Sequence, residues 1–154
     1  MLRSLLFLLL GVASAAEPIN LAVNKPVTAS GEQNSGGNIA AAGNDGDNAT
    51  RWCCDNGNLG NWWQVDLQQP SRISRIEIDW EHQFIPYQYR IEVSSDGTTW
   101  KTAVDATATP GLIEKEARHK VNESGVRFVK ITVTGQPGGV WTGFWELRVL
   151  GITS

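Results

Sequence analysis

Apolar and polar residues alternate with a period of two along several short stretches of the chain. In residues 76–81, Ile and Trp alternate with Glu and Asp, and in residues 129–133, Val and Ile alternate with Lys and Thr. Residues 145–149 repeat the pattern, with Trp, Leu and Val against Glu and Arg. This alternation predicts strands with one buried and one exposed face, which is typical of antiparallel sheets.

Segments rich in β-branched and aromatic residues predict the main strands, at residues 61–67, 72–80, 87–94, 126–135 and 144–151. Clusters of Gly, Asn, Asp and Ser between these segments predict turns. Residues 112–121 fit either a short helix or an edge strand, and no long stretch has helical periodicity. This pattern predicts an all-β domain, either a sandwich or a barrel.

The beginning of the chain has the layout of a secretory signal peptide. Arg3 is followed by an apolar run from Leu5 and by small residues up to Ala16. The alternative is a buried N-terminal helix, and the run is too short for a membrane span, which needs about 20 residues. We predict a signal peptide over residues 1–16, cleaved after Ala15 or Ala16, and one exported, soluble domain over residues 17–154.

Net charge and the absence of catalytic motifs argue against several classes of function. The net charge of −3 and the lack of a Lys/Arg cluster argue against nucleic acid and against an anionic membrane. The sequence has no G-x-S-x-G, H-E-x-x-H, phosphate-loop or Cys-x-x-Cys motif, and only two histidines. Glu81 is a candidate for one carboxylate of a glycosidase pair, but nothing in the sequence pairs it with a second carboxylate. We therefore predict that the protein is not an enzyme.

A set of motifs, in this order along the chain, resembles the discoidin or coagulation-factor type C domain, and within it the bacterial carbohydrate-binding modules of family 32. The motifs are NLAVNKPVTAS from Asn20, NDGDNATRW from Asn44, WWQVDL from Trp62, IEVSSDGTTW from Ile91 and FWELRVLG from Phe144. The resemblance implies a jelly-roll-like antiparallel β-sandwich of about eight main strands, with ligand loops at one end. It also implies a secreted, non-catalytic, lectin-like module that binds carbohydrate.

An acidic, Gly-containing turn carries Asp45, Asp47 and Thr50. Such a turn can aim oxygens at a hard cation, which takes about six to eight of them, or it can hydrogen-bond its own backbone without a metal. The resemblance favours a structural Ca²⁺ here. Carried over to this chain, its ligands are the Ala42 carbonyl, the Asp45 carboxylate, the Asp47 carbonyl, both Thr50 oxygens, the Trp145 carbonyl and the Glu146 carboxylate.

The only two cysteines, Cys53 and Cys54, are adjacent. Neighbouring Cα atoms lie about 3.8 Å apart, closer than the roughly 4.4–6.8 Å of an ordinary disulfide, so a bond between them is strained and closes no loop. One hypothesis is a vicinal disulfide at a ligand-binding rim, which export favours. The others are a buried pair of small apolar residues, a metal site shared with His82 or His119, and intermolecular bridging.

Sugar binding needs an aromatic face and a few polar groups, and seven tryptophans are available. The candidates for ligand contact lie in loops: Asn44, Cys53, Cys54, Glu81, His82, Phe84, Tyr87 and Trp141. Asn44 also fits a turn former, and His82 also fits an ordinary surface residue. The remaining tryptophans with assigned places, Trp52, Trp63, Trp80, Trp100 and Trp145, are expected in the core.

The alternative function is an extracellular adhesion module that binds a protein partner or a phospholipid surface. A lipid-binding module is expected to expose apolar loop residues flanked by Lys and Arg. Phe84 and Ile85 are the only loop pair of this kind, and their surroundings are not basic. Carbohydrate binding therefore remains the preferred prediction.

Overall fold

The computed structural model describes residues 16–108 and 116–153, so the predicted signal peptide lies almost entirely outside the described residues. The described residues are mostly antiparallel strand, with two short 3-10 helices, η1 (Asn34–Gly36) and η2 (Ala40–Gly43). No helix in these two ranges has the length and apolarity to cross a membrane. The strands are β1 (Ile19–Asn20), β2 (Val27–Ala29), β3 (Trp52–Cys53), β4 (Trp62–Trp80), β5 (Gln88–Ser94), β6 (Lys101–Ala106), β7 (Glu116–Gly135) and β8 (Gly143–Thr153).

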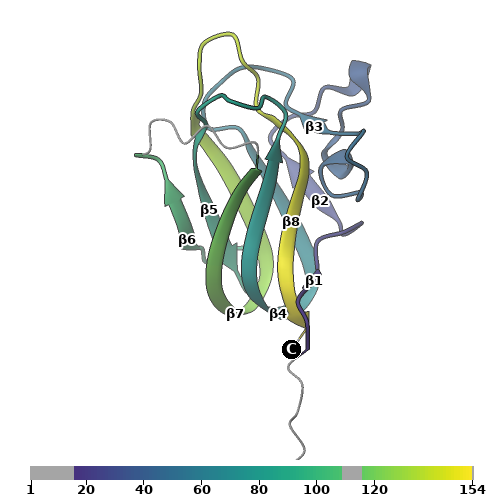
Figure 1. The fold of residues 1–154 in the computed structure, drawn as a ribbon, viewed down its shortest axis with the longest axis vertical. Helices are drawn as coiled ribbons and strands as arrows, with labels where there is room; N and C mark the ends of the chain where they lie inside the picture. Colours follow the sequence, from purple (N-terminus) through teal and green to yellow (C-terminus); the bar gives the residue numbers. More distant parts are fainter. Residues whose placement is uncertain (1–15, 109–115, 154) are drawn as a thin grey trace, which may run out of the picture.

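The strands form two layers that share β4 and β7. The first part of β4 pairs with β2 and with the second part of β7, and β5 and β6 extend this layer. The second part of β4 pairs with the first part of β7 and with β8, which also carries β1 and β3. The predicted all-β, jelly-roll-like antiparallel sandwich is confirmed (Figure 1).

The bend in β4 explains why two predicted strands appear as one. The segments 61–67 and 72–80 are joined through residues where the pairing register shifts, between Asp66 and Ser71. Gln68 lies within this bend with φ 68°, a left-handed conformation. Pro70 also lies here, where its lack of an N–H leaves no ladder bond unmade. The strand thus continues from one layer into the other.

The ambiguous segment 112–121 is a strand over its described part. It belongs to β7 from Glu116 onward, while residues 112–115 lie outside the described residues. Its backbone pairs with β4, with Lys120 opposite Arg75 and His119 opposite Ile76. The segment is a strand because pairing with the sheet satisfies the backbone N–H and C=O groups, which a helix would satisfy within itself.

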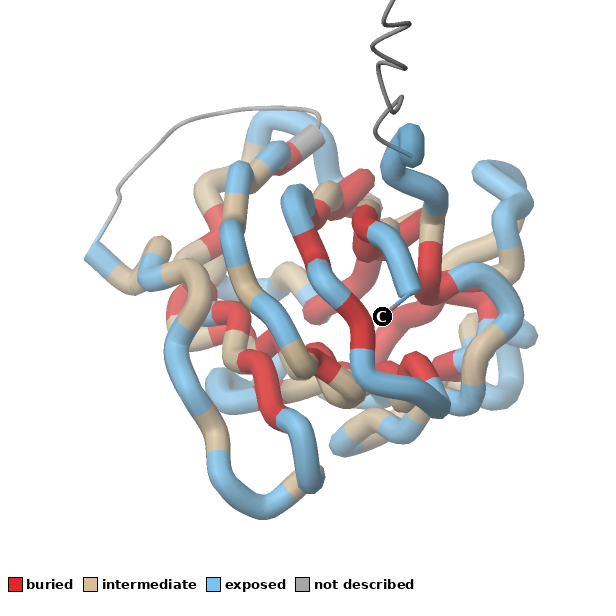
Figure 2. The backbone as a smooth tube through the Cα atoms, turned by 90° about the horizontal axis from the view of Figure 1, so that it is seen from below, coloured by how far each residue is buried: buried red, intermediate tan, exposed pale blue. Residues whose placement is uncertain are grey.

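The core between the layers is aromatic near the loop end. The Phe144 ring lies 5.1 Å from Trp52 and 5.4 Å from Trp63, and Trp80 stacks on Tyr87 at 4.2 Å, all between ring centroids. Figure 2 shows buried segments alternating with exposed ones along the strands, as the period-two pattern predicts.

Two tryptophans differ from the expected core positions. Trp100 and Trp145 are only partly buried. Each carries a cation on its ring face instead: Lys130 Nζ lies 4.1 Å from the Trp100 centroid, and the Arg51 guanidinium lies 5.3 Å from that of Trp145. Both rings cover the outside of the sheets, where a cationic side chain can pack on them.

The loops that carry several of the predicted ligand contacts gather at one end of the sandwich. The loops that join β4 to β5 and β7 to β8 stand at the top of Figure 1, and the C-terminus lies at the opposite end. β3 reaches this loop end by pairing with the start of β8, with Cys53 opposite Gly143. Segments far apart in the sequence therefore meet there.

Candidate functional site

A pocket of about 250 Å³ opens among these loops. Its lining comes from four places in the sequence: Gln33, the Arg51–Cys53 region, the end of β4 and the loop before β8. The lining residues are Gln33, Arg51, Cys53, Glu81, His82, Gly139 and Trp141. Four of the predicted ligand contacts, Cys53, Glu81, His82 and Trp141, are thus brought together.

Trp141 supplies an aromatic surface at this pocket, with 38% of the residue exposed. Its position is set by contact between two loops, because Gln136 Nε2 donates to the carbonyls of Gly57 (3.2 Å) and Val140 (2.7 Å). Thr142 Oγ1 donates to the same Gln136 side chain at 2.9 Å. A Cβ at Gly57 would lie 3.2 Å from Trp141 Cδ1, so glycine allows the close approach of the two loops.

Arg51 and Glu81 form an ion pair in the pocket, with Arg51 Nε 2.9 Å from Glu81 Oε1. His82 Nε2 lies 4.0 Å from the same oxygen. The Arg51 guanidinium also packs over the Trp145 ring, and the Glu81 backbone N–H donates to the Gly143 carbonyl at 3.1 Å. Glu81 Oε2 is buried and accepts no hydrogen bond from any described residue.

The two adjacent cysteines have different surroundings. Cys53 lines the pocket beside Glu81, whereas Cys54 is fully buried, with Sγ 3.8 Å from Ser30 Oγ and 3.6 Å from Asp55 Oδ1. Burial raises the pKa of Cys53 to about 12, assisted by the charge of Glu81, and burial also raises the pKa of Cys54.

Both cysteines are free and buried in the described structure, and the predicted vicinal disulfide stays a prediction. The arrangement matches the alternative hypothesis of a buried pair. Cys54, a predicted ligand contact, has no exposed surface and is not among the residues that line the pocket.

Two further predicted ligand contacts, Asn44 and Tyr87, are not among the residues that line the pocket. Asn44 is 1% exposed, and its side-chain amide donates to the backbone carbonyls of Ala22 (2.6 Å) and Lys25 (3.0 Å), so it acts as the alternative turn former. Tyr87 is 6% exposed because its ring stacks in the core. Phe84 is 68% exposed in a left-handed conformation with φ 70°, but it is not among the residues that line the pocket.

Sequence analysis missed Gln33, Arg51 and Gly139. Arg51 precedes a buried tryptophan, and a lone arginine there carries no signal of its role. Gln33 joins the pocket because its backbone N–H donates to the Cys53 carbonyl at 2.9 Å, a contact across 20 residues of sequence. The position of Gly139 in a Pro-Gly-Gly turn was recognised only as a turn signal.

The acidic turn after η2 meets the start of β8. Thr50 Oγ1 donates to Asp45 Oδ2 at 2.7 Å and lies 3.0 Å from the Asp47 carbonyl oxygen. The Gly46 backbone N–H donates to Glu146 Oε1 at 2.8 Å. Asp45, Asp47, Thr50 and Glu146 of the predicted metal set are therefore close together, although they come from opposite ends of the sequence.

Glu146 is 1% exposed, and its Oε2 has no hydrogen-bond partner among the described residues. Burial, assisted by neighbouring Asp45, raises the pKa of Glu146 to about 7. The described residues contain no group of three or more His, Cys, Asp and Glu side chains arranged for a metal. A cation here would therefore need backbone carbonyls, those predicted for Ala42, Asp47 and Trp145, beside the two carboxylates.

Comparison with known proteins gives the family. The F5/8 type C domain model matches residues 26–147. The fold is similar to that of CpGH89CBM32-4 from Clostridium perfringens, solved in complex with GlcNAc-α-1,4-galactose, with TM-score 0.78, 24% identity and coverage of 90% of this chain and 97% of that one. This level of identity shows the fold alone.

Two modules from a chitosanase/glucanase of Paenibacillus sp. IK-5 are also similar. Chitosan-binding module 1 has TM-score 0.76 and 28% identity, covering 86% of this chain and 99% of that one. Chitosan-binding module 2, in complex with chitotriose, has TM-score 0.70 and 28% identity, covering 84% and 98%. Comparison with curated protein sequences gives no significant match. With the family match spanning most of its length, the chain belongs to the F5/8 type C domain family.

Proposed function

We propose that this protein is a non-catalytic carbohydrate-binding module whose loop-end pocket holds a sugar. The observation that carries the proposal is the exposed Trp141 ring beside the polar groups of Arg51, His82 and Gln33 in one pocket. An apolar ring face with a few polar anchors is the usual pattern of a small-ligand site. The similarity to chitosan-binding modules at 28% identity supports the same ligand class.

The composition of the pocket favours binding without catalysis. Glycoside hydrolysis generally uses two carboxyl groups about 5–10 Å apart, one of them as an acid. Among the described lining residues Glu81 is the one carboxylate, and it is paired with Arg51 at 2.9 Å. A carboxylate held in an ion pair is a poor proton donor.

A glycan array with the purified protein in calcium buffer tests the proposal. We expect binding to a group of related glycans, and at least about tenfold weaker binding by Trp141→Ala, since aromatic anchors dominate such sites. Phe84→Ala is the matched control, because it removes an exposed loop aromatic outside the pocket. A blank array with folded protein would refute sugar binding, and liposome and pull-down assays would then test the adhesion alternative.

We also propose a structural Ca²⁺ between the acidic turn and β8. The residues fit such an ion, since Glu146 Oε2 is buried without a described partner next to Asp45 and Thr50. Asp45, Thr50 and Glu146 would hold it with the carbonyls of Ala42, Asp47 and Trp145. A bound divalent cation would compensate the two carboxylate charges and link the turn to the last strand.

Finally, we propose that the chain is exported. The support is the layout of residues 1–16, with a cationic start, an apolar run and small residues before Glu17. Expression in a secreting host followed by mass measurement of the product tests this. A mature protein beginning at Ala16 or Glu17 is expected, and an uncleaved chain retained in the cell would contradict it.

A further inference from the structure

The described lining of the pocket contains one cationic side chain, Arg51, and one anionic side chain, Glu81. These two side chains form an ion pair with each other. Arg51 Nε and Glu81 Oε1 are 2.9 Å apart, with side chains 29% and 14% exposed. Such partial burial strengthens the pairing relative to a fully exposed ion pair. The opposite charges of Arg51 and Glu81 therefore cancel within the described lining of the pocket.

Glu81 presents little carboxylate surface to a cationic ligand, since its side chain is 14% exposed. Oε1 faces Arg51, and Oε2 is buried on the side of Gly143, where an added Cβ would lie only 2.5 Å from it. The charge of Glu81 acts on the groups beneath the pocket, because it adds to the effect of burial in raising the pKa values of Cys53 and Tyr87. A ligand ammonium group would have to break the ion pair to reach this carboxylate.

Hydrogen-bond donors remain on the pocket side. Arg51 Nε lies 2.9 Å from Glu81 Oε1 but has no hydrogen-bond partner among the described residues, and the guanidinium packs over the Trp145 ring, so Arg51 keeps donor capacity. Gln33 Oε1 accepts a hydrogen bond from Asn38 Nδ2, which leaves the Gln33 NH₂ group as a donor. Donors of this kind suit hydroxyl and amide-carbonyl oxygens on a sugar.

We infer that the pocket selects an uncharged saccharide, such as an N-acetylated or hydroxyl-bearing sugar, and discriminates against its protonated amino-sugar form. This rests on the proposed function. An ammonium group would either lie next to Arg51 or separate Glu81 from its partner, and both leave a charge uncompensated in a partly buried site. The selectivity would differ from that of the similar modules described as chitosan-binding, whose polymer is cationic.

Matched pairs of ligands test the inference by calorimetric titration. The pairs are tri-N-acetylchitotriose with chitotriose, and N-acetylgalactosamine with galactosamine, at a pH where the amines are protonated. We expect the neutral member of a bound pair to bind about tenfold or more tightly than the amino member, the equivalent of one charge-assisted hydrogen bond. Its affinity should change little with salt, because no net charge is neutralised on binding.

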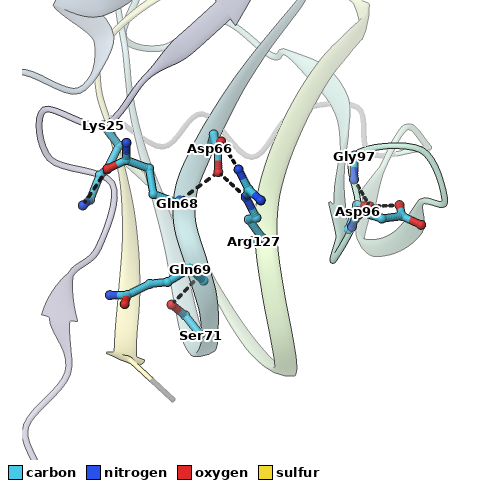
Figure 3. Close-up of polar contacts among 9 residues, drawn as sticks. Lys25, Asp66, Gln68, Gln69, Ser71, Asp96, Gly97 and Arg127 are labelled. Carbon is cyan, nitrogen blue, oxygen red and sulfur yellow. Dashed lines mark hydrogen bonds and ion pairs between the residues drawn. The ribbon is translucent and has the colours of Figure 1, made fainter.

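Two substitutions move the selectivity in opposite directions. Arg51→Gln frees the Glu81 carboxylate and should shift preference toward the amino sugar, while Glu81→Gln frees the Arg51 guanidinium and should shift it toward the corresponding uronate. Arg127→Gln is the matched control, since it also breaks an ion pair between an arginine and a carboxylate. Arg127 Nε lies 2.9 Å from Asp66 Oδ1 (Figure 3), and Arg127 is not among the residues that line the pocket. It should leave selectivity unchanged. Circular dichroism melts establish that each variant is folded.

The outcomes separate the inference from the proposed function. Tighter binding of chitotriose or galactosamine than of the neutral partner by the unmodified protein would overturn the inference and leave sugar binding intact. A folded Arg51→Gln variant without any shift toward amino sugars would overturn it as well. No binding to any saccharide on the array would remove the proposed function, and the inference with it.

Discussion

Calcium should stabilise the fold through Glu146. This carboxylate is buried at 1% exposure with one oxygen unpartnered among the described residues, so without a cation its charged form is poorly compensated. An ion that binds only the folded state stabilises it by about 2.7 kcal/mol at a hundredfold excess over Kd. For a domain of this size that corresponds to a rise in Tm on the order of 10 °C.

The substitution Glu146→Gln should abolish this response. The amide keeps the size of the side chain and retains an oxygen acceptor for the Gly46 N–H, but it removes the charge that attracts the ion. We therefore expect the Tm of the variant in chelator to equal or exceed that of the unmodified protein, and to stay constant when calcium is added.

Differential scanning calorimetry in calcium and in chelator measures both quantities. Glu92→Gln is the control, because it removes a partly buried carboxylate on β5, 3.4 Å from Arg90, and should retain the full calcium response. Equal Tm values of the unmodified protein in calcium and in chelator would refute the calcium site. A full calcium response in Glu146→Gln would refute the role given to this carboxylate.

Three other predictions concern stability and the thiols. Phe144→Ala, at a fully buried ring between tryptophans, should lower the free energy of unfolding in urea by about 3–5 kcal/mol. Hydrogen bonding to Arg127 lowers the pKa of Asp66, so its contribution is present above about pH 4 and is lost as pH falls through the lower folded pKa. Asp66→Asn should flatten this acid limb of the stability curve, and an unchanged limb would contradict the pairing. The thiols of Cys53 and Cys54 should resist alkylation by iodoacetamide at pH 8 until the protein unfolds, since burial raises the pKa values of both thiols. Rapid alkylation of the native protein would show that the thiols are accessible.

Local sequence pattern predicted the strands and much of the core, because side chains in a strand alternate between faces whatever the neighbouring chain is. Ile76, Ile78 and Trp80 are buried as their spacing predicts. The family resemblance added the sandwich architecture and the gathering of the acidic turn near Glu146.

The course of β4 and β7 was decided by tertiary structure. The sequence predicts a break between two strands at residues 68–70. In the structure β4 continues through these residues with a bend, because both halves of β4 pair with β7. Pairing with β4 likewise makes the segment from Glu116 a strand. Whether such a segment breaks, bends or coils depends on hydrogen-bond partners more than thirty residues away, which local propensity does not encode.

The sequence by itself therefore determined the all-β class, the strand faces and a short set of loop residues from which the site is drawn. Only the tertiary structure decided which of them meet. Cys53 lines the pocket, whereas Cys54 lies in the core, and the Asn44 side chain hydrogen-bonds to a backbone carbonyl. Arg51 lies against Glu81. The physical reason is that burial and ion pairing belong to contacts between segments, and those contacts exist only once the two layers have closed on each other.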